Sequence, residues 1–75
     1  MMITLYSAKW CPWCQKTKEF LRANDIEFEE KDIDIKEVEE ELKDITNQDA
    51  VPAVVAGEEF VVGYDEEKLK EVLKI

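Results

Sequence analysis

The feature that most constrains this chain is the alternation of strand-like and helix-like segments within only 75 residues. The alternating, β-rich run MITLY predicts a strand over residues 2–6, and the segment 12–25 predicts a helix. Pro12 suits the first turn of that helix, because the N–H that proline lacks would have no partner there. A second strand is expected within 26–34, where apolar and charged residues alternate.

The second half of the chain continues the pattern. Residues 36–48 predict an amphipathic surface helix whose buried stripe is Val38, Leu42 and Ile45, with Asp34 as a candidate N-cap. Two short strands at 53–56 and 60–63 and a helix over 65–75, capped by Asp65, follow. The order β-α-β-α-β-β-α predicts a single α/β domain over residues 1–75: a minimal four-stranded mixed sheet flanked by helices.

The charge is distributed unevenly along the chain. Residues 1–24 carry four basic and one acidic side chain (4 − 1 = +3), and the remaining 51 carry six basic and eighteen acidic ones (6 − 18 = −12). The segment with the cysteines is therefore a basic patch on an acidic body. A net charge of −9 argues against binding to nucleic acid.

The N-terminal residues MMITLYSA lack the charged start and apolar run of a signal peptide, and no apolar stretch reaches the roughly 20 residues of a membrane span. We therefore expect a cytoplasmic protein without a membrane partner. In that compartment disulfides are mostly transient and catalytic rather than structural.

Cys11 and Cys14, with Pro12 and Trp13 between them, are the only cysteines of the chain. A closed zinc site takes four protein ligands, and the chain has no histidine, so a metal site would need a second chain or carboxylates. A structural disulfide over this spacing would close a very small loop and gain little from chain entropy. Both alternatives stay open, but a redox-active dithiol fits the pattern best.

The expected helix start gives the two sulfurs different roles. Cys11 would be the N-cap, facing unpaired backbone N–H groups and the positive end of the helix dipole, and Lys9 and Lys16 would add positive potential that favours its thiolate. Cys14, one turn later on the inner side, would stay a buried thiol. Cys11 would then attack a substrate disulfide, and Cys14 would displace the product, leaving a reversible Cys11–Cys14 disulfide.

The motif CPWC, after a strand and at the start of a helix, resembles the active site of thioredoxin-fold redoxins. Within these it is most similar to glutaredoxins, whose usual motif is Cys-Pro-Tyr-Cys, and to the small NrdH-type redoxins that reduce ribonucleotide reductase. Two further segments, AVPAVV and VGYDEEKL, resemble the family's Thr-Val-Pro and Gly-Gly-Tyr-Asp-Asp segments. The three matches occur in the family's order and extend over nearly the whole chain.

The resemblance implies a substrate-binding surface around the cysteines. The Val51–Pro52 peptide bond would be cis and face the sulfurs, and its backbone would pair with a peptide or glutathione as a short added strand. The simpler alternative is that Pro52 only starts an edge strand. Gly63 would let the backbone approach the ligand, Tyr64 would follow it in the same binding segment, and Asp65 would meet a ligand amine.

The resemblance also assigns residues of the cysteine loop. Pro12 and Trp13 would belong to the substrate surface, with Trp13 exposed beside Cys11. Trp10 would pack under the loop, as the tryptophan before the motif does in thioredoxins. Tyr6 would lie partly in the core, and Lys9 would take over from the lysine that glutaredoxins carry three residues before the first cysteine.

Departures from the family pattern affect the choice of reductant. That glutaredoxin lysine is replaced by Ala8, the first glycine of the Gly-Gly pair by Val62 and the threonine before Val-Pro by Ala50. These changes weaken a glutathione clamp and favour an NrdH-type redoxin, which thioredoxin reductase recharges. Against this, NrdH-type redoxins often lack a proline at the position of Pro12, and the Asp65–Glu66 pair is more similar to glutaredoxin.

The expected function is thus a dithiol–disulfide oxidoreductase without a bound cofactor. It would act as a monomer on protein disulfides, ribonucleotide reductase among them, with thioredoxin reductase as the source of electrons. The alternatives are a glutathione-dependent glutaredoxin and a carrier that holds an iron–sulfur cluster between two chains; the resolving Cys14 and Pro12 argue against the carrier.

Overall fold

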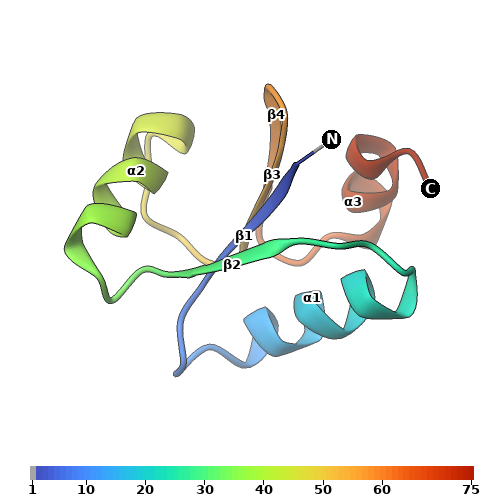
Figure 1. Cartoon of the computed structure of the whole chain (residues 1–75), viewed down its shortest axis with the longest axis horizontal. Coiled ribbons are helices and arrows are strands. Elements are labelled where there is room, and N and C mark those ends of the chain that lie inside the picture. The colour runs from blue at the N-terminus through green and yellow to red at the C-terminus, as the bar shows by residue number, and fades with distance from the viewer. Residues whose placement is uncertain (1) are drawn as a thin grey trace.

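The computed structural model describes residues 2–75 as a four-stranded mixed sheet with helices on both faces (Figure 1). In chain order the elements are β1 (Ile3–Ser7), α1 (Pro12–Ala23), β2 (Glu29–Asp32), α2 (Lys36–Thr46), β3 (Ala53–Ala56), β4 (Glu59–Val62) and α3 (Glu66–Leu73). The predicted order β-α-β-α-β-β-α is confirmed. Among residues 2–75, no helix has the length and apolar character needed to cross a membrane.

The strands lie in the order β2-β1-β3-β4. β1 and β2 are parallel, with Leu5 opposite Glu30, and α1 forms the crossover that a parallel pair requires. β3 runs antiparallel to β1, with Leu5 opposite Val54, and β4 returns beside β3. The tight turn between β3 and β4 contains Gly57, whose φ of +65° costs a glycine less than a residue with a side chain.

The sheet separates two apolar clusters, because successive side chains of β1 point to opposite faces. Leu5 packs with Leu21 of α1 and Leu69 of α3 on one face. Tyr6 packs with Leu42 of α2 on the other face, in the same cluster as both cysteines. Figure 1 shows this division, with α1 and α3 on one side of the sheet and α2 on the other. The cysteines are thus part of the core that α2 covers.

The structure corrects two predictions for α2. Ile35, not Asp34, is the N-cap, and no side chain caps this helix; the Asp34 carboxylate instead accepts a hydrogen bond from Trp10. Ile45 is 38% exposed and does not belong to the buried stripe. Thr46 is buried in its place, because residues at i and i+4 share a helix face and Leu42 faces the sheet.

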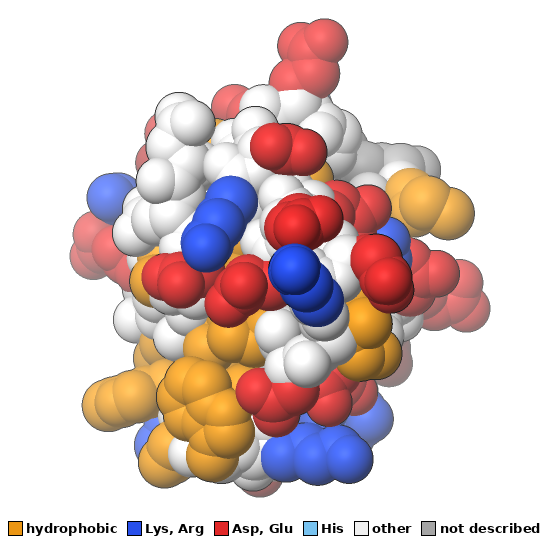
Figure 2. Space-filling view, turned by 90° about the vertical axis from the view of Figure 1, so that its left-hand side faces the viewer, with side chains coloured by type: hydrophobic (Ala, Val, Ile, Leu, Met, Phe, Trp, Pro, Cys, Tyr) orange, Lys and Arg blue, Asp and Glu red, His pale blue; other side chains and the backbone are white. Residues whose placement is uncertain are grey.

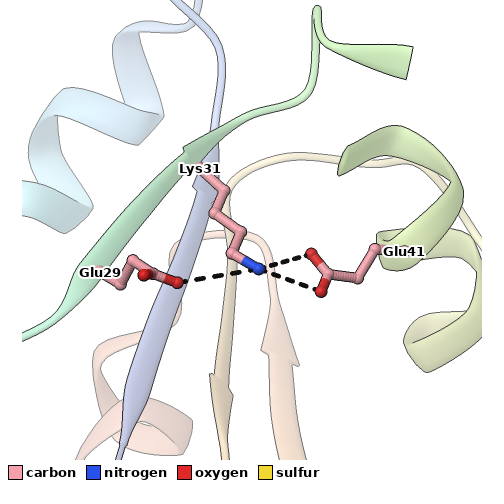
Figure 3. A network of polar contacts seen from close by, with 3 residues as sticks. All are labelled: Glu29, Lys31 and Glu41. Carbon is pink, nitrogen blue, oxygen red and sulfur yellow. Dashed lines mark hydrogen bonds and ion pairs between the residues drawn. The ribbon is translucent and has the colours of Figure 1, made fainter. Parts of the chain in front are cut away.

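An ion-pair network joins the edge strand β2 to α2 (Figure 3). The Lys31 ammonium donates to both carboxylate oxygens of Glu41, at 3.0 and 2.8 Å, and lies 3.7 Å from the Glu29 carboxylate. The hydrogen bond to Glu41 raises the pKa of Lys31, and Lys31 in turn lowers the pKa of Glu41. Charged side chains on an edge strand also discourage pairing with a second sheet.

We expect Leu42→Ala to lower the free energy of unfolding by about 3 kcal/mol, because it empties a fully buried site between α2 and the sheet. Ile45→Ala, three residues further along the same helix, should cost less than about 1 kcal/mol because Ile45 is partly exposed. Urea unfolding followed by circular dichroism measures both. Equal losses would contradict the assignment of the buried face of α2.

Candidate active site

The loop after β1 places Cys11 at the start of α1. Cys11 is the N-cap, with extended backbone angles, and its sulfur accepts a hydrogen bond from the Cys14 backbone N–H at 3.2 Å. The Cys11 N–H donates to the Ala8 carbonyl at 3.2 Å, which closes the turn before the helix. The predicted N-cap position of Cys11 and the predicted helix start at Pro12 are both confirmed.

The two free thiols differ in their surroundings. Cys11 is 6% exposed, whereas Cys14 has no exposed surface. Burial is the largest cause that raises the pKa of Cys14 to about 12, and a hydrogen bond to Cys11 and the charge of Cys11 add to it. The Ala8 backbone and the Lys18 charge act in the opposite direction. At neutral pH, Cys14 is therefore a protonated thiol behind Cys11.

The segment before β3 faces the first sulfur. The Val51–Pro52 peptide bond is cis, and the Cys11 thiol lies 4.0 Å from the Val51 carbonyl oxygen, to which it donates. The Pro52 carbonyl accepts a hydrogen bond from the Gly63 N–H at 2.7 Å, which ties this segment to the end of β4. Gly63 has a φ of +90°, in the region that side-chain-bearing residues rarely adopt.

An aromatic contact extends this site. The Trp13 ring stacks on Tyr64 with centroids 5.8 Å apart, and Phe20 meets Tyr64 edge to face at 6.3 Å. A pocket of about 200 Å³ is lined by Trp13, Val51, Pro52, Gly63 and Tyr64. Five residues predicted to bind substrate are thus brought together from three separate segments of the chain.

The other predicted site residues lie outside this pocket. Lys9 is exposed and lines a separate hollow of about 260 Å³. Asp65 is the N-cap of α3, where its carboxylate accepts a hydrogen bond from the Lys68 N–H at 3.2 Å. Pro12 is exposed at the first position of α1, next to Cys11. A role for any of these three in substrate binding stays a prediction.

The surface around the cysteine loop exposes two tryptophans beside Lys9 and Lys16, in contrast with the acidic body. Trp10 and Trp13 are 65% and 56% exposed. The predicted packing of Trp10 under the loop is wrong: its indole N–H donates to the Asp34 carboxylate at 3.4 Å, at the start of α2, so the ring lies on the surface. Figure 2, which views the α2 side, shows acidic side chains over much of this face and hydrophobic ones at its lower end.

A polar network near the cysteines was not expected from the sequence. One carboxylate oxygen of Glu30 accepts a hydrogen bond from the Ser7 hydroxyl at 2.8 Å and lies 2.7 Å from the Lys18 ammonium. The hydrogen bond from Lys18 is the largest cause that lowers the pKa of Glu30, ahead of burial, which opposes it. The sequence gives one indication of a charge here: Cys14 and Lys18 are four residues apart on a predicted helix, so they share a helix face.

These features define a class of protein. A buried CxxC pair at the start of a helix after β1, with a cis-proline segment facing it, is the arrangement of a thioredoxin-fold redoxin. In the described part of the chain, residues 2–75, no three His, Cys, Asp or Glu side chains are grouped to hold a metal ion. The glutaredoxin family model matches residues 3–61, and the chain belongs to the glutaredoxin family.

Relatives agree with this assignment. The chain is 33% identical to an uncharacterized glutaredoxin-like 8.6 kDa protein of the rubredoxin operon of Clostridium pasteurianum, over 97% of this chain and 99% of that one. The structure of glutaredoxin grx-1 from Archaeoglobus fulgidus is similar with a TM-score of 0.90 and 38% identity, covering 96% of this chain and 85% of that one. The structure of NrdH-redoxin from Escherichia coli, a glutaredoxin-like protein with a thioredoxin-like activity profile, is similar with a TM-score of 0.84 and 26% identity. This match covers 95% of this chain and 93% of that one.

Alkylation rates should separate the two thiols. We expect iodoacetamide at pH 8 to modify Cys14 in a Cys11→Ser variant at least about tenfold more slowly than Cys11 in a Cys14→Ser variant, because only the thiolate reacts and Cys14 is buried with a raised pKa. Mass spectrometry of quenched samples measures both rates. Equal rates would contradict the different burial of the two sulfurs.

The Glu30 carboxylate should make stability depend on pH. Its pKa is lower in the folded state than its ordinary value of 4.5, so its stabilisation is present above that value and is lost as the pH falls through the folded pKa. Glu30→Gln should therefore lower the free energy of unfolding at pH 7 by less than about 1 kcal/mol, because the side chain is 39% exposed. Urea unfolding at pH 7 and pH 3 tests this; a loss that persists undiminished at pH 3 would rule out an ionic cause.

Proposed function

We propose that this chain is a dithiol–disulfide oxidoreductase that reduces disulfides of proteins, with Cys11 as the nucleophile and Cys14 as the resolving thiol. The observation that carries the proposal is the asymmetry of the pair. Cys11 lies at the helix N-terminus beside the Val51 carbonyl, and Cys14 is fully buried one turn behind it. Sequential attack by two sulfurs requires a first thiol that the substrate can reach and a second thiol that stays protonated until the first has reacted.

The reaction has two steps. The Cys11 thiolate attacks one sulfur of the substrate disulfide, a Cys11–substrate bond forms, and the other substrate sulfur leaves as a thiolate that takes a proton from water. Cys14 then loses its proton to water and attacks the Cys11 sulfur. The Cys11–Cys14 disulfide forms, the Cys11–substrate bond breaks, and the second substrate sulfur leaves as a thiolate that takes a proton from water. The substrate has then gained two electrons and two protons.

The surroundings of Cys14 suit this order. Part of the rise in the pKa of Cys14 comes from its hydrogen bond to Cys11 and from the charge of Cys11. In the mixed disulfide, Cys11 carries no charge, so these two contributions disappear. Cys14 therefore becomes easier to deprotonate once Cys11 has reacted, and stays protonated before that.

We favour thioredoxin reductase over glutathione as the reductant. Ala8, at the position of the glutaredoxin lysine, is buried in the cluster with both cysteines, and Lys9 lines a hollow apart from the pocket between Trp13 and Tyr64. No lysine is among the residues that line that pocket; the Lys16 ammonium lies 5.9 Å from the centroid of the Trp13 ring, beside the pocket rather than in its lining. The similarity to NrdH-redoxin, a glutaredoxin-like protein with a thioredoxin-like activity profile, supports the same choice. With it we propose a role as electron donor to enzymes such as ribonucleotide reductase, which the resemblance of the sequence motifs to NrdH-type redoxins implies.

Glutathione is the second candidate reductant, because one observation favours it. The pocket that contains Val51, Pro52 and Tyr64 offers backbone groups beside Cys11, and the relative with 38% identity is a glutaredoxin. In either case, an exchanging dithiol without a bound cofactor belongs in a reducing compartment such as the cytoplasm.

A side-by-side turnover assay on insulin disulfides and on a glutathione mixed disulfide decides between thioredoxin reductase and glutathione as the reductant. One arm supplies NADPH and thioredoxin reductase; the other supplies NADPH, glutathione reductase and glutathione. We expect turnover in the first arm and at least about tenfold less in the second, since the clamp for glutathione is incomplete. The reverse ratio would make the chain a glutathione-dependent glutaredoxin.

Matched cysteine variants serve as controls in the same assay. Cys11→Ser should abolish activity in both arms, because the attacking sulfur is gone. Cys14→Ser should accumulate a mixed disulfide, visible as a covalent adduct by mass spectrometry, because nothing displaces the substrate. Full activity of Cys11→Ser, or no activity of the unmodified chain with either reductant, would overturn the proposed function.

A further inference from the structure

A partly buried ion pair lies beside the resolving cysteine, and the two reaction steps above do not use it. Lys18 follows Cys14 by four residues in α1, so the two side chains leave the helix on the same face, one turn apart. The Lys18 side chain is only 14% exposed, although lysine rarely lies so deep without a partner. Its ammonium is therefore held near the buried end of the cysteine loop.

Two strands hold this ammonium in place. Glu30 of β2 lies 2.7 Å from it, and the same carboxylate oxygen accepts the Ser7 hydroxyl at 2.8 Å. Ser7 is the last residue of β1, and Ala8, which follows it, packs in the cluster with both cysteines. Ser7, Ala8, Lys18 and Glu30 all line the hollow of about 260 Å³. The pair is thus fixed to the strand from which the cysteine loop emerges.

We propose that Lys18, held by Glu30 and Ser7, is a positioning residue for the second step of the reaction, where its positive charge stabilises the Cys14 thiolate. The inference rests on the proposed dithiol function and deepens it. In that step the Cys14 sulfur forms a bond to the Cys11 sulfur, the bond from Cys11 to the substrate breaks, and the electron pair leaves on the substrate sulfur. The proton from Cys14 passes to water, and the departing thiolate takes one from water.

A fixed cation at this place matters because Cys14 is fully buried. Burial penalises the thiolate, and the charge of Lys18 acts against that penalty. An opposite charge near an ionisable group favours its charged form, and Lys18 lies one helical turn after Cys14 on the same face of α1. Glu30 offsets part of this charge while it fixes the position, so loss of Lys18 and loss of the Glu30 charge should act on Cys14 in opposite directions.

The second step can be observed directly with 2,2′-dipyridyl disulfide. Attack by Cys11 releases one thiopyridone, and displacement by Cys14 releases a second in a first-order phase that is independent of reagent concentration. In stopped-flow measurements from pH 5 to pH 10, the midpoint of the second phase reports when Cys14 loses its proton. The first phase reports Cys11 in the same trace and serves as an internal control.

We expect Lys18→Met to move the midpoint of the second phase up by about one pH unit, which slows it about tenfold at neutral pH and leaves its rate at high pH unchanged. The first phase should change less than twofold. Lys18→Arg should have the same midpoint as the unmodified chain, because arginine keeps the positive charge. Lys36→Met, the same change at an exposed position of α2, should alter neither phase.

Glu30→Gln separates an electrostatic from a structural role, because it should move the midpoint to lower pH. A purely structural network predicts that both variants slow the second phase equally at every pH, and that result would overturn the inference. An unchanged midpoint in Lys18→Met would do the same. Absence of a second phase in the unmodified chain would instead overturn the dithiol function itself. If Lys18→Met does not fold, Glu30→Gln still decides the sign, because a midpoint that does not move to lower pH would overturn the inference.

Discussion

The hydrogen bond from the Cys14 amide to the Cys11 sulfur connects the fold of this chain to its chemistry. A helix start leaves backbone N–H groups without partners, and here a sulfur accepts one of them. The helix that begins at this bond is also the crossover that makes β1 and β2 parallel. The same turn therefore organises the sheet and places the Cys11 sulfur beside the Val51 carbonyl at the sheet's end.

The edge strand β2 is attached to the rest of the protein without apolar side chains of its own. Its four residues, Glu29–Asp32, include no apolar side chain, so the strand cannot be fixed by core packing of its own. Neighbouring residues instead reach opposite layers: Glu30 pairs with Lys18 of α1, and Lys31 pairs with Glu41 of α2. Partly exposed ion pairs of this kind contribute on the order of 1 kcal/mol each, so the backbone ladder with β1 carries most of the register.

Sequence patterns predicted the elements well where a local signal existed. Pro12 located the start of α1, and the alternation in MITLY predicted the strand that becomes β1. The predictions failed where the partner is distant in the chain. Ile45 fits a helical stripe, but the docking of α2 decides that Thr46 faces inward. Trp10 lies on the surface because the start of α2 brings the Asp34 carboxylate to its indole N–H.

The sequence by itself determined the order of the strands and helices, the position of both cysteines at a helix start, and the concentration of negative charge outside that segment. These follow from periodicity, capping and composition, which act over a few residues. Only the tertiary structure decided that Trp13 stacks on Tyr64 and that Lys18, one helical turn after Cys14, pairs with Glu30. These contacts join residues far apart in the chain, and the sheet register and helix docking that create them depend on the whole fold.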